Sequence, residues 1–477
     1  MRIISPPLFV GREEELALLE KKYHSSSAEM IVVVGRRRIG KSVLIEKFCN
    51  EKNSLQFEGL EGEQTKSQIK YFTATLQKQL KDPILESVNF DSWIAAFDYL
   101  TAKIPVRGEK MVLVFDELQW MAAGQGKLVS LIKSYWDKEW KKKKLLLILC
   151  GSIASFMVHQ VIRSKALYGR ITGEIHLKGL SPHESIGMFK NKRGLGEILQ
   201  YLFVFGGVPK YLEMIDLKKS FGQNMNELCF HSHALLLTEF EKIFFSQFKT
   251  YQTYIRIVKS LKDKMFSLDE LSKNLKTSSG GGLLRYIHQL EEAEFIRSYI
   301  SFDQNQNTKF KKYRLFDEFL LFYFKYMSPH LRTIKESSSS RIFELLTKDS
   351  WEVWCGLAFE RFCIKHAHPI ARVLGFSDAV LQVAPYFGRG DRQFQIDMIY
   401  SRADQVITVC EIKYNREPIG TKIIAEVERK TKLLKIPRAY TLEKVLICVN
   451  DATDAVKESE YFHHILPIQE IFSRLPH

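Results

Sequence analysis

Eight residues constrain the fold of this chain more than any others: positions 35–42 read GRRRIGKS. They follow the apolar run IVVV at 31–34, which predicts a buried strand, and they precede VLIEKFCN, which predicts a helix. A strand, a glycine-bearing loop and a helix in this order are typical of a P-loop, whose backbone N–H groups surround phosphate at the positive end of the helix. The pattern predicts an α/β domain that binds ATP.

The residue types within the loop match separate tasks in nucleotide binding. Gly35 and Gly40 let the backbone approach phosphate closely, Lys41 is placed to contact the β- and γ-phosphates, and Ser42 is placed to put its hydroxyl on Mg²⁺. The candidate cofactor-binding residues of the loop are Gly35, Arg36, Arg37, Arg38, Ile39, Gly40, Lys41, Ser42 and Val43.

Two further apolar runs, at 111–117 (MVLVFDE) and 145–152 (LLLILCGS), are separated by helical patterns, which favours a parallel sheet. Asp116 ends the first run, where it is expected to hold Mg²⁺ through water, and Glu117 is placed to polarise the attacking water. This acidic pair predicts hydrolysis as well as binding. Ser152 follows the second run, at the position of a polar sensor for the γ-phosphate.

Composition narrows the setting in which the chain works. The net charge is +15 at pH 7, and nearly all of the excess of Lys and Arg lies before residue 341. A basic surface favours nucleic acid as a partner, although solubility alone also explains it. No apolar run approaches the roughly 20 residues that span a bilayer, and the N-terminus lacks a secretion signal. The seven cysteines form no CxxC pair, which argues against zinc. We expect a cytoplasmic protein with no membrane partner.

A chain of 477 residues is expected to form several domains. The P-loop domain is predicted at 1–180, and helical periodicity predicts a lid at 181–248. Over 249–336, three helices and two strands resemble a winged helix-turn-helix. The serines at 337–340 are typical of a linker, and 341–477 reads as a second α/β domain.

The expected recognition helix of the winged segment is GGLLRYIHQLEEAEF, with Arg285 and His288 away from its apolar face. Lys309, Lys311 and Lys312 lie on the predicted wing, where they are placed to grip phosphate. Nearby glutamates would repel phosphate, and such modules also serve internal packing. Both interpretations stay open.

The last domain carries a second group of acidic residues. Asp397 lies in FQIDMIY, and the next strand, VITVCEIKYN, presents Glu411 and Lys413 on one face because they are two residues apart. Carboxylates in apolar strands are costly unless a cation compensates them. This spacing resembles the PD-(D/E)XK nuclease core, and Glu360 on the earlier helix AFERF matches the acid that often completes its metal shell.

That resemblance implies a restriction-endonuclease-like fold and a metal-dependent site. Glu360, Asp397 and Glu411 are the candidate ligands of Mg²⁺ or Mn²⁺, which activates water, while Lys413 steadies the developing charge. A simpler explanation of E-x-K is the alternation of charged and apolar residues that any half-exposed strand shows. A second alternative is that this domain binds nucleic acid but has lost the ability to cleave it.

Six segments together resemble the AAA+/STAND-type ATPase family of archaea and bacteria, and the resemblance extends over nearly the whole chain. They are FVGREEEL at 9–16, GRRRIGKS, VFDELQW at 114–120, LCGS at 149–152, LYGR at 167–170 and GGVPKYL at 206–212. The resemblance implies that Val10, Gly11 and Arg12 lie near the adenine and that Pro209 approaches the nucleotide from the lid. It also implies that Arg170 stabilises transition-state charge, in its own subunit or from a neighbour.

Together these patterns predict an ATP-hydrolysing ATPase whose nucleotide state controls a C-terminal metal-dependent nuclease-like domain acting on DNA. A homo-oligomer or a regulatory protein partner is compatible with them. Two alternatives stay open: a non-nucleolytic switch with a silent C-terminal domain, and a DNA-binding regulator that acts through the winged helix.

Overall fold

The computed structural model describes residues 8–474 except for 83–84, 86–88, 153–155, 249–250, 278–280, 301–310, 338 and 389–393. The chain forms two compact units. The first contains the described residues of Met1–Gly179, Val208–Glu213 and Gln247–Lys249, and the second those of Leu180–Gly207, Met214–Ser246 and Thr250–His477. The first of these units ends its longest segment at Gly179, next to the domain boundary that the sequence predicts after residue 180. The three later predicted domains lie in the second unit, apart from short segments.

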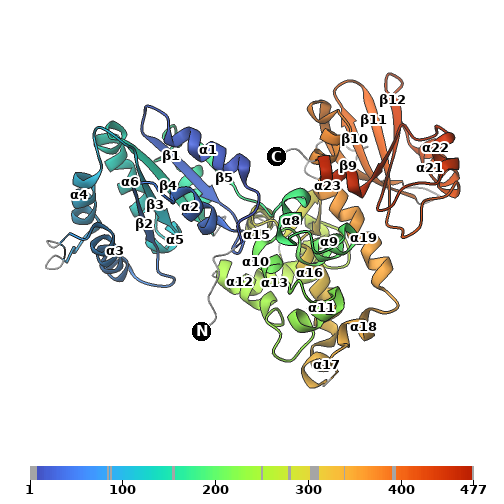
Figure 1. The fold of residues 1–477 in the computed structure, drawn as a ribbon, viewed down its shortest axis with the longest axis horizontal. Coiled ribbons are helices and arrows are strands. Elements are labelled where there is room, and N and C mark those ends of the chain that lie inside the picture. Colours follow the sequence, from blue (N-terminus) through green and yellow to red (C-terminus); the bar gives the residue numbers. More distant parts are fainter. Residues whose placement is uncertain are drawn as a thin grey trace. The chain divides into compact units, whose positions relative to one another are not determined.

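The first unit is built on a five-stranded parallel sheet with strand order β2-β3-β4-β1-β5 (Figure 1). Every residue of β1 and β4 is buried, as expected for strands covered on both faces. The sheet confirms the predicted α/β fold of this part. Its strands are β1 (Glu29–Val34), β2 (Ser54–Glu58), β3 (Met111–Asp116), β4 (Leu145–Gly151) and β5 (Gly173–His176).

Aromatic side chains pack the core on one face of this sheet. Phe57 stacks on Phe72 with 4.0 Å between ring centroids, and Phe97 stacks on Phe115 at 5.8 Å. Trp140 is fully buried in the same cluster. Each such aromatic pair stabilises the fold by about 0.5–1.5 kcal/mol beyond the effect of burying its surface. Phe57 and Phe115 lie near the ends of β2 and β3, so these pairs stabilise the part of the sheet next to the P-loop. The helices of this unit are α1 (Glu13–Tyr23), α2 (Lys41–Cys49), α3 (Thr65–Leu80), α4 (Trp93–Lys103), α5 (Leu118–Met121), α6 (Lys127–Lys138) and α10 (Pro209–Glu213).

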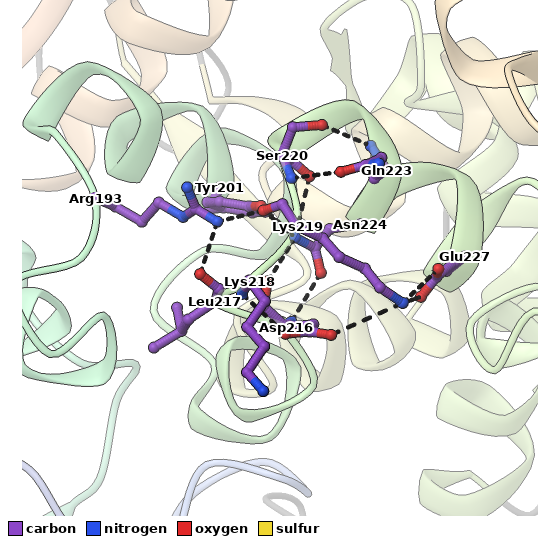
Figure 2. A network of polar contacts seen from close by, with 10 residues as sticks. All are labelled: Arg193, Tyr201, Asp216, Leu217, Lys218, Lys219, Ser220, Gln223, Asn224 and Glu227. Carbon is purple, nitrogen blue, oxygen red and sulfur yellow. Dashed lines mark hydrogen bonds and ion pairs between the residues drawn. The ribbon is translucent and has the colours of Figure 1, made fainter.

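The second unit begins with helices, and one buried amide organises the loop before α11 (Phe221–Cys229), as Figure 2 shows. Asn224 is 2% exposed, its Nδ2 donates to the Tyr201 hydroxyl at 3.0 Å, and its Oδ1 accepts from the Asp216 N–H at 2.8 Å. Arg193 donates to the Leu217 carbonyl at 3.0 Å. These bonds satisfy backbone groups that no helix or strand pairs. The neighbouring helices are α8 (Pro182–Met188), α9 (Leu195–Phe205), α12 (Glu239–Gln247), α16 (Glu318–Phe322), α17 (Leu331–Glu336) and α18 (Ile342–Thr347).

Within this unit a small antiparallel sheet has strand order β6-β8-β7. Its elements follow the order that the sequence predicts for 249–336, with a short extra strand between the first two helices. Lys309 of the predicted wing lies outside the described residues. The elements are α13 (Tyr251–Ser260), β6 (Phe266–Ser267), α14 (Leu268–Leu275), α15 (Gly281–Glu292), β7 (Ile296–Tyr299) and β8 (Lys312–Leu315).

The C-terminal part is a mixed sheet with strand order β13-β12-β11-β10-β9. Strands β9, β10 and β11 are antiparallel neighbours, whereas β11, β12 and β13 run parallel. Helix α19 packs on β11, and α21 connects β11 to β12 (Figure 1). The elements are α19 (Trp351–Lys365), α20 (Ala367–Val373), β9 (Val380–Gly388), β10 (Phe394–Arg402), β11 (Val406–Lys413), α21 (Lys422–Leu433), β12 (Thr441–Cys448), α22 (Asp454–Glu458), β13 (His464–Pro467) and α23 (Ile468–Arg474).

Two expectations from composition concern the described residues directly. None of the helices in the described ranges has both the length and the apolar character needed to cross a bilayer. All seven cysteines are buried and free of disulfide bonds.

Candidate functional site

The P-loop begins where β1 ends, and its backbone conformation depends on glycine. Gly40 caps the N-terminus of α2 with φ 93°, a left-handed conformation that favours glycine. At Gly35 an added Cβ would lie 2.6 Å from the carbonyl oxygen of Leu177, so only glycine allows the two backbones to approach. The loop therefore turns directly in front of the positive end of α2.

The two functional side chains at the start of α2 contact groups at the end of the sheet and in the loop. Lys41 is 5% exposed, and its Nζ donates to the carbonyls of Gly35 at 3.0 Å and Arg36 at 3.1 Å. Ser42 Oγ donates to Asp116 Oδ2 at 2.8 Å. A hydroxyl and a carboxylate side by side are oxygen ligands of the kind Mg²⁺ prefers. The residues present therefore fit a nucleotide with its magnesium ion.

Glu117 follows Asp116 in a strained conformation and is held by two polar side chains. Its φ is 47°, which a residue with a Cβ adopts at a cost. Ser152 Oγ donates to Glu117 Oε2 at 2.6 Å, and Gln119 Nε2 donates both to that carboxylate and to Ser152 Oγ. The structure thus places Ser152 against Glu117. Gln119 was missed by sequence reasoning because it lies inside the short helix α5.

Glu58 is a third carboxylate at the same edge of the sheet. It ends β2 directly opposite Asp116 in the strand register. Burial raises the pKa of Glu58, and the charges of Asp116 and Glu117 raise it further. Glu58 could have been predicted from the sequence, because it ends the run SLQFE and polar functional residues gather at the carboxyl ends of parallel strands. The excess of negative charge here suits a cation.

Arg12 ties the N-terminal segment to the P-loop. It is 5% exposed, and its Nη2 donates to the carbonyls of Lys178 at 2.6 Å and Ile39 at 3.3 Å. Gly11 and Arg12 both have positive φ, 65° and 70°, and Val10 before them is half-buried. Pro209 lies beside the loop, since its Cγ is 3.8 Å from the position of a Cβ added to Gly40.

The C-terminal sheet brings two predicted acids together. The register pairs Met398 with Cys410, so Asp397 and Glu411 occupy the next positions on neighbouring strands. Asp397 is 7% exposed, and its Oδ2 accepts the N–H of Ile412 at 3.0 Å. Burial raises the pKa of Asp397 to about 7, with further contributions from the charges of Glu411 and Glu360. All three predicted acids therefore lie near one another.

Two lysines neutralise Glu411, which is 1% exposed. Lys413 Nζ lies 2.8 Å from Glu411 Oε1, as E-x-K predicts. Lys430 of α21 donates to both carboxylate oxygens at 2.6 and 2.8 Å, and Glu426 contacts both lysines at 3.1 Å. Sequence reasoning missed Lys430. Among the described residues, which include Glu360, Asp397 and Glu411, no three His, Cys, Asp or Glu side chains form a group that could hold a metal ion.

The comparisons with known proteins bear on the first of these two sites. Residues 9–215 match a family described as an ATPase domain predominantly from Archaea. The match supports ATPase activity for the site formed by the P-loop, Asp116 and Glu117.

Individual relatives and solved structures are also similar to the chain. An uncharacterised protein of Methanocaldococcus jannaschii is 28% identical over 432 residues, or 90% of this chain and 92% of that protein. An uncharacterised ATP-binding protein of the same organism is 49% identical over 45 residues, 9% of this chain and 76% of its own length. A Walker-type ATPase of Pyrococcus abyssi is similar in structure, with 19% identity, a TM-score of 0.47 and coverage of 66% of this chain and 95% of that one.

Three predicted arginines of the ATPase domain have partners within it. Arg37 pairs with Glu61 at 2.8 Å, and the guanidinium of Arg38 lies 5.7 Å from the ring centroid of Tyr211. Arg170 forms a two-pronged ion pair with Asp137 of α6, with both contacts at 2.8 Å. This hydrogen bonding lowers the pKa of Asp137. The structure places Arg170 in that pair, and its role in catalysis stays a prediction.

Proposed function

We propose that the ATPase domain hydrolyses ATP and that its nucleotide state controls DNA cleavage at the C-terminal carboxylate cluster, Glu360, Asp397 and Glu411 with Lys413. The proposal of DNA cleavage rests on the burial of Asp397 and Glu411, which lie on adjacent strands and are 7% and 1% exposed. Lys413 lies two residues beyond Glu411 on the same strand. Burying two carboxylates side by side is costly, and such a cost is typical of a functional site.

At the nucleotide, each residue has a task that its contacts support. The ammonium group of Lys41 lies inside the loop, where it would contact the β- and γ-phosphates of bound ATP. Ser42 and Asp116 would hold Mg²⁺, which neutralises charge on the phosphates. Glu117 accepts the proton of the attacking water, and its bonds from Ser152 and Gln119 orient the carboxylate.

At the C-terminal cluster, Asp397 and Glu411 are the residues that would hold a divalent cation, with Glu360 beside them. The cation would activate water and stabilise the leaving oxygen. Lys413 stays within 2.8 Å of Glu411 and steadies negative charge on the phosphate. The mixed sheet and the helix α19 packed on β11 support the proposed PD-(D/E)XK core.

DNA as the substrate is supported by the element order of the small β6-β8-β7 module, which is that of a winged helix. Arg285 and His288 are exposed on α15, whereas Ile287 and Leu290 between and beyond them are buried. The helix therefore presents the Arg285 guanidinium and the His288 imidazole to solvent while its apolar face packs inward.

A second candidate function, an ATP-dependent switch without nuclease activity, has its own supporting observation. Lys430 contacts both oxygens of Glu411, so a cation bound there must compete with an ammonium group already in place. In that case the C-terminal domain binds nucleic acid and does not cut it.

Two assays test the proposal. ATP turnover is expected to disappear in Lys41→Ala, and undiminished turnover contradicts the nucleotide assignment. Labelled single- and double-stranded DNA is then incubated with the full chain and Mg²⁺ or Mn²⁺. Cleavage that is absent in Asp397→Asn supports the nuclease. No cleavage by the wild type under any of these conditions favours the non-nucleolytic switch.

A further inference from the structure

Three arginines meet where β7, β8 and α19 come together in the second unit, and the functions described above use none of them. Arg297 and Arg314 are directly opposite each other in the antiparallel register of β7 and β8. Their side chains therefore share one face of the sheet, while Ile296 and Leu315 are buried on the other. Like charges at such a pair are destabilising unless something else compensates them.

The face that carries these arginines is covered by the C-terminal part of the same unit. Arg297 Nη1 donates to the carbonyl of Ile364, near the end of α19, at 3.4 Å. Gln382 of β9 donates to the carbonyl of Ile300 at 3.4 Å. Arg361 comes from α19 itself. Burial and the charge of Arg314 lower its pKa to about 10, while the charges of Glu360 and Glu318 oppose that change. All three arginines are half-buried.

Aromatic rings orient the guanidinium groups and leave their charge in place. Arg297 lies 5.2 Å from the ring centroid of Phe316 and 5.9 Å from that of Tyr299, and Arg361 lies 5.9 Å from that of Trp354. Burial raises the pKa of Tyr299, and the charges of all three arginines oppose that rise. The charges of all three arginines therefore act on one tyrosine.

Carboxylates balance only part of this charge: the negative charges of Glu360 and Glu318 act on Arg361. Across the part of the chain that the structure describes, no Asp or Glu forms an ion pair with any of the three arginines. The nearby Glu318 is paired with Lys365 at 2.5 Å. Partly buried cations without compensation are costly, so the cluster suits an anion.

Glu360 connects this arginine cluster to the proposed cleavage site. Burial raises its pKa, while the charges of Arg314 and Arg361 lower it; Lys413 and Glu411 act on the same carboxyl group. Glu360 directly precedes Arg361 in α19, and α19 packs on β11, the strand that carries the E-x-K residues. An anion bound by the arginines would lie next to the carboxylate cluster.

We propose that Arg297, Arg314 and Arg361 bind a backbone phosphate of the nucleic acid strand that enters the C-terminal carboxylate cluster. Guanidinium groups suit phosphate because their fixed N–H donors pair with its oxygens. The C-terminal residues from 341 onward are nearly balanced in charge, so the strands β7 and β8 would supply the cations that this region lacks. The proposal rests on the proposed function for its choice of nucleic acid as the substrate.

Binding is tested on the full chain in EDTA, where cleavage does not interfere, by fluorescence anisotropy of a labelled oligonucleotide over a series of salt concentrations. Arg314→Gln is expected to weaken binding and to reduce the slope of log affinity against log salt by about 1. Arg361→Gln is expected to act in the same direction. Arg332→Gln is the matched control, because Arg332 is 88% exposed in α17 and pairs with Glu336.

Thermal unfolding separates a phosphate site from simple packing. In phosphate-free buffer Arg314→Gln is expected to melt at the same temperature as the wild type or higher, because it removes a repulsive pair. The oligonucleotide should raise the melting temperature of the wild type more than that of the variant. Variants that melt lower but bind with unchanged affinity and salt slope overturn the proposal. So does inorganic phosphate that stabilises the wild type as strongly as the oligonucleotide at equal phosphate concentration.

The two proposals fail in different ways. Wild-type protein that binds through the arginines but never cuts DNA contradicts the nuclease and leaves the phosphate site intact. Metal-dependent cleavage that requires Asp397, together with binding that ignores all three arginines, contradicts the phosphate site alone.

Discussion

Gly40 shows how strongly a single residue determines the nucleotide site. Its φ of 93° places the Lys41 and Ser42 side chains at the start of α2, one toward the loop carbonyls and one toward Asp116. A residue with a Cβ pays about 1–2 kcal/mol to adopt the left-handed region. The loop therefore loses its shape when that residue changes.

Gly40→Ala is expected to lower the free energy of unfolding by about 1–2 kcal/mol and to abolish tight ATP binding. Calorimetric titration with ATP and thermal unfolding measure the two effects. Gly62→Ala is the matched control: its φ is 78° with open space around it, so it should cost similar stability while ATP binding persists. Equal ATP affinity in both variants contradicts the account of the loop.

Glu117→Gln separates binding from hydrolysis. The amide keeps the shape of the side chain but does not accept a proton, so ATP turnover should fall by roughly 10²–10⁴-fold with little change in ATP affinity. Turnover within a few-fold of the wild type would show that another group acts as the base. Glu139→Gln, at the end of α6, serves as the control.

At the scale of elements, α21 reinforces the strand that carries the E-x-K residues. Lys430 and Glu426 are one helical turn apart and contact each other; Lys430 also contacts Glu411 of β11, and Glu426 contacts Lys413 of the same strand. Glu411 is nearly inaccessible, so its charge depends on these contacts. Removing one partner of a buried pair costs far more than removing one partner of an exposed pair.

Lys430→Met is expected to lower the free energy of unfolding by about 2–4 kcal/mol, because it leaves the buried Glu411 carboxylate with one partner fewer. The loss is limited because Lys413 still contacts Glu411. Lys432→Met on the same helix removes only an exposed pair with Glu428, at 3.3 Å, and should leave the free energy of unfolding almost unchanged. Urea denaturation measures both. Equal costs would mean that the Lys430 contacts contribute little.

The sequence predicted those parts of both sites that lie in contiguous motifs or at strand ends. Lys41, Ser42 and Asp116 meet because a P-loop and the end of a neighbouring parallel strand share one edge of the sheet. Asp397 and Glu411 are adjacent because a short hairpin joins their strands. Strand alternation and motif spacing carry this information.

The remaining partners depend on tertiary packing. Lys430 is one of several lysines in α21, and no local pattern distinguishes the one that turns toward Glu411. Gln119 was missed for a similar reason, whereas Glu58 follows from the rule for the carboxyl ends of parallel strands. The arginine cluster joins three separate segments, two of them on either side of a hairpin, so its convergence follows only from how α19 packs on that hairpin.

At the scale of the whole molecule, the chain passes repeatedly between the two units. Gly207 belongs to the second unit, and its carbonyl accepts the N–H of Leu180 at 2.7 Å. Two residues later, Pro209 lies beside Gly40 of the P-loop. A change at the nucleotide is therefore covalently close to the unit that carries the carboxylate cluster.

The most direct test of this account measures metal-dependent DNA cleavage by the full chain with ATP, with ADP and without nucleotide, for the wild type, Lys41→Ala and Asp397→Asn. The account predicts a wild-type cleavage rate that changes with the nucleotide, a Lys41→Ala rate that is the same in all three conditions, and no cleavage by Asp397→Asn. A wild-type rate that is identical with ATP, with ADP and without nucleotide, or cleavage that persists in Asp397→Asn, would contradict it.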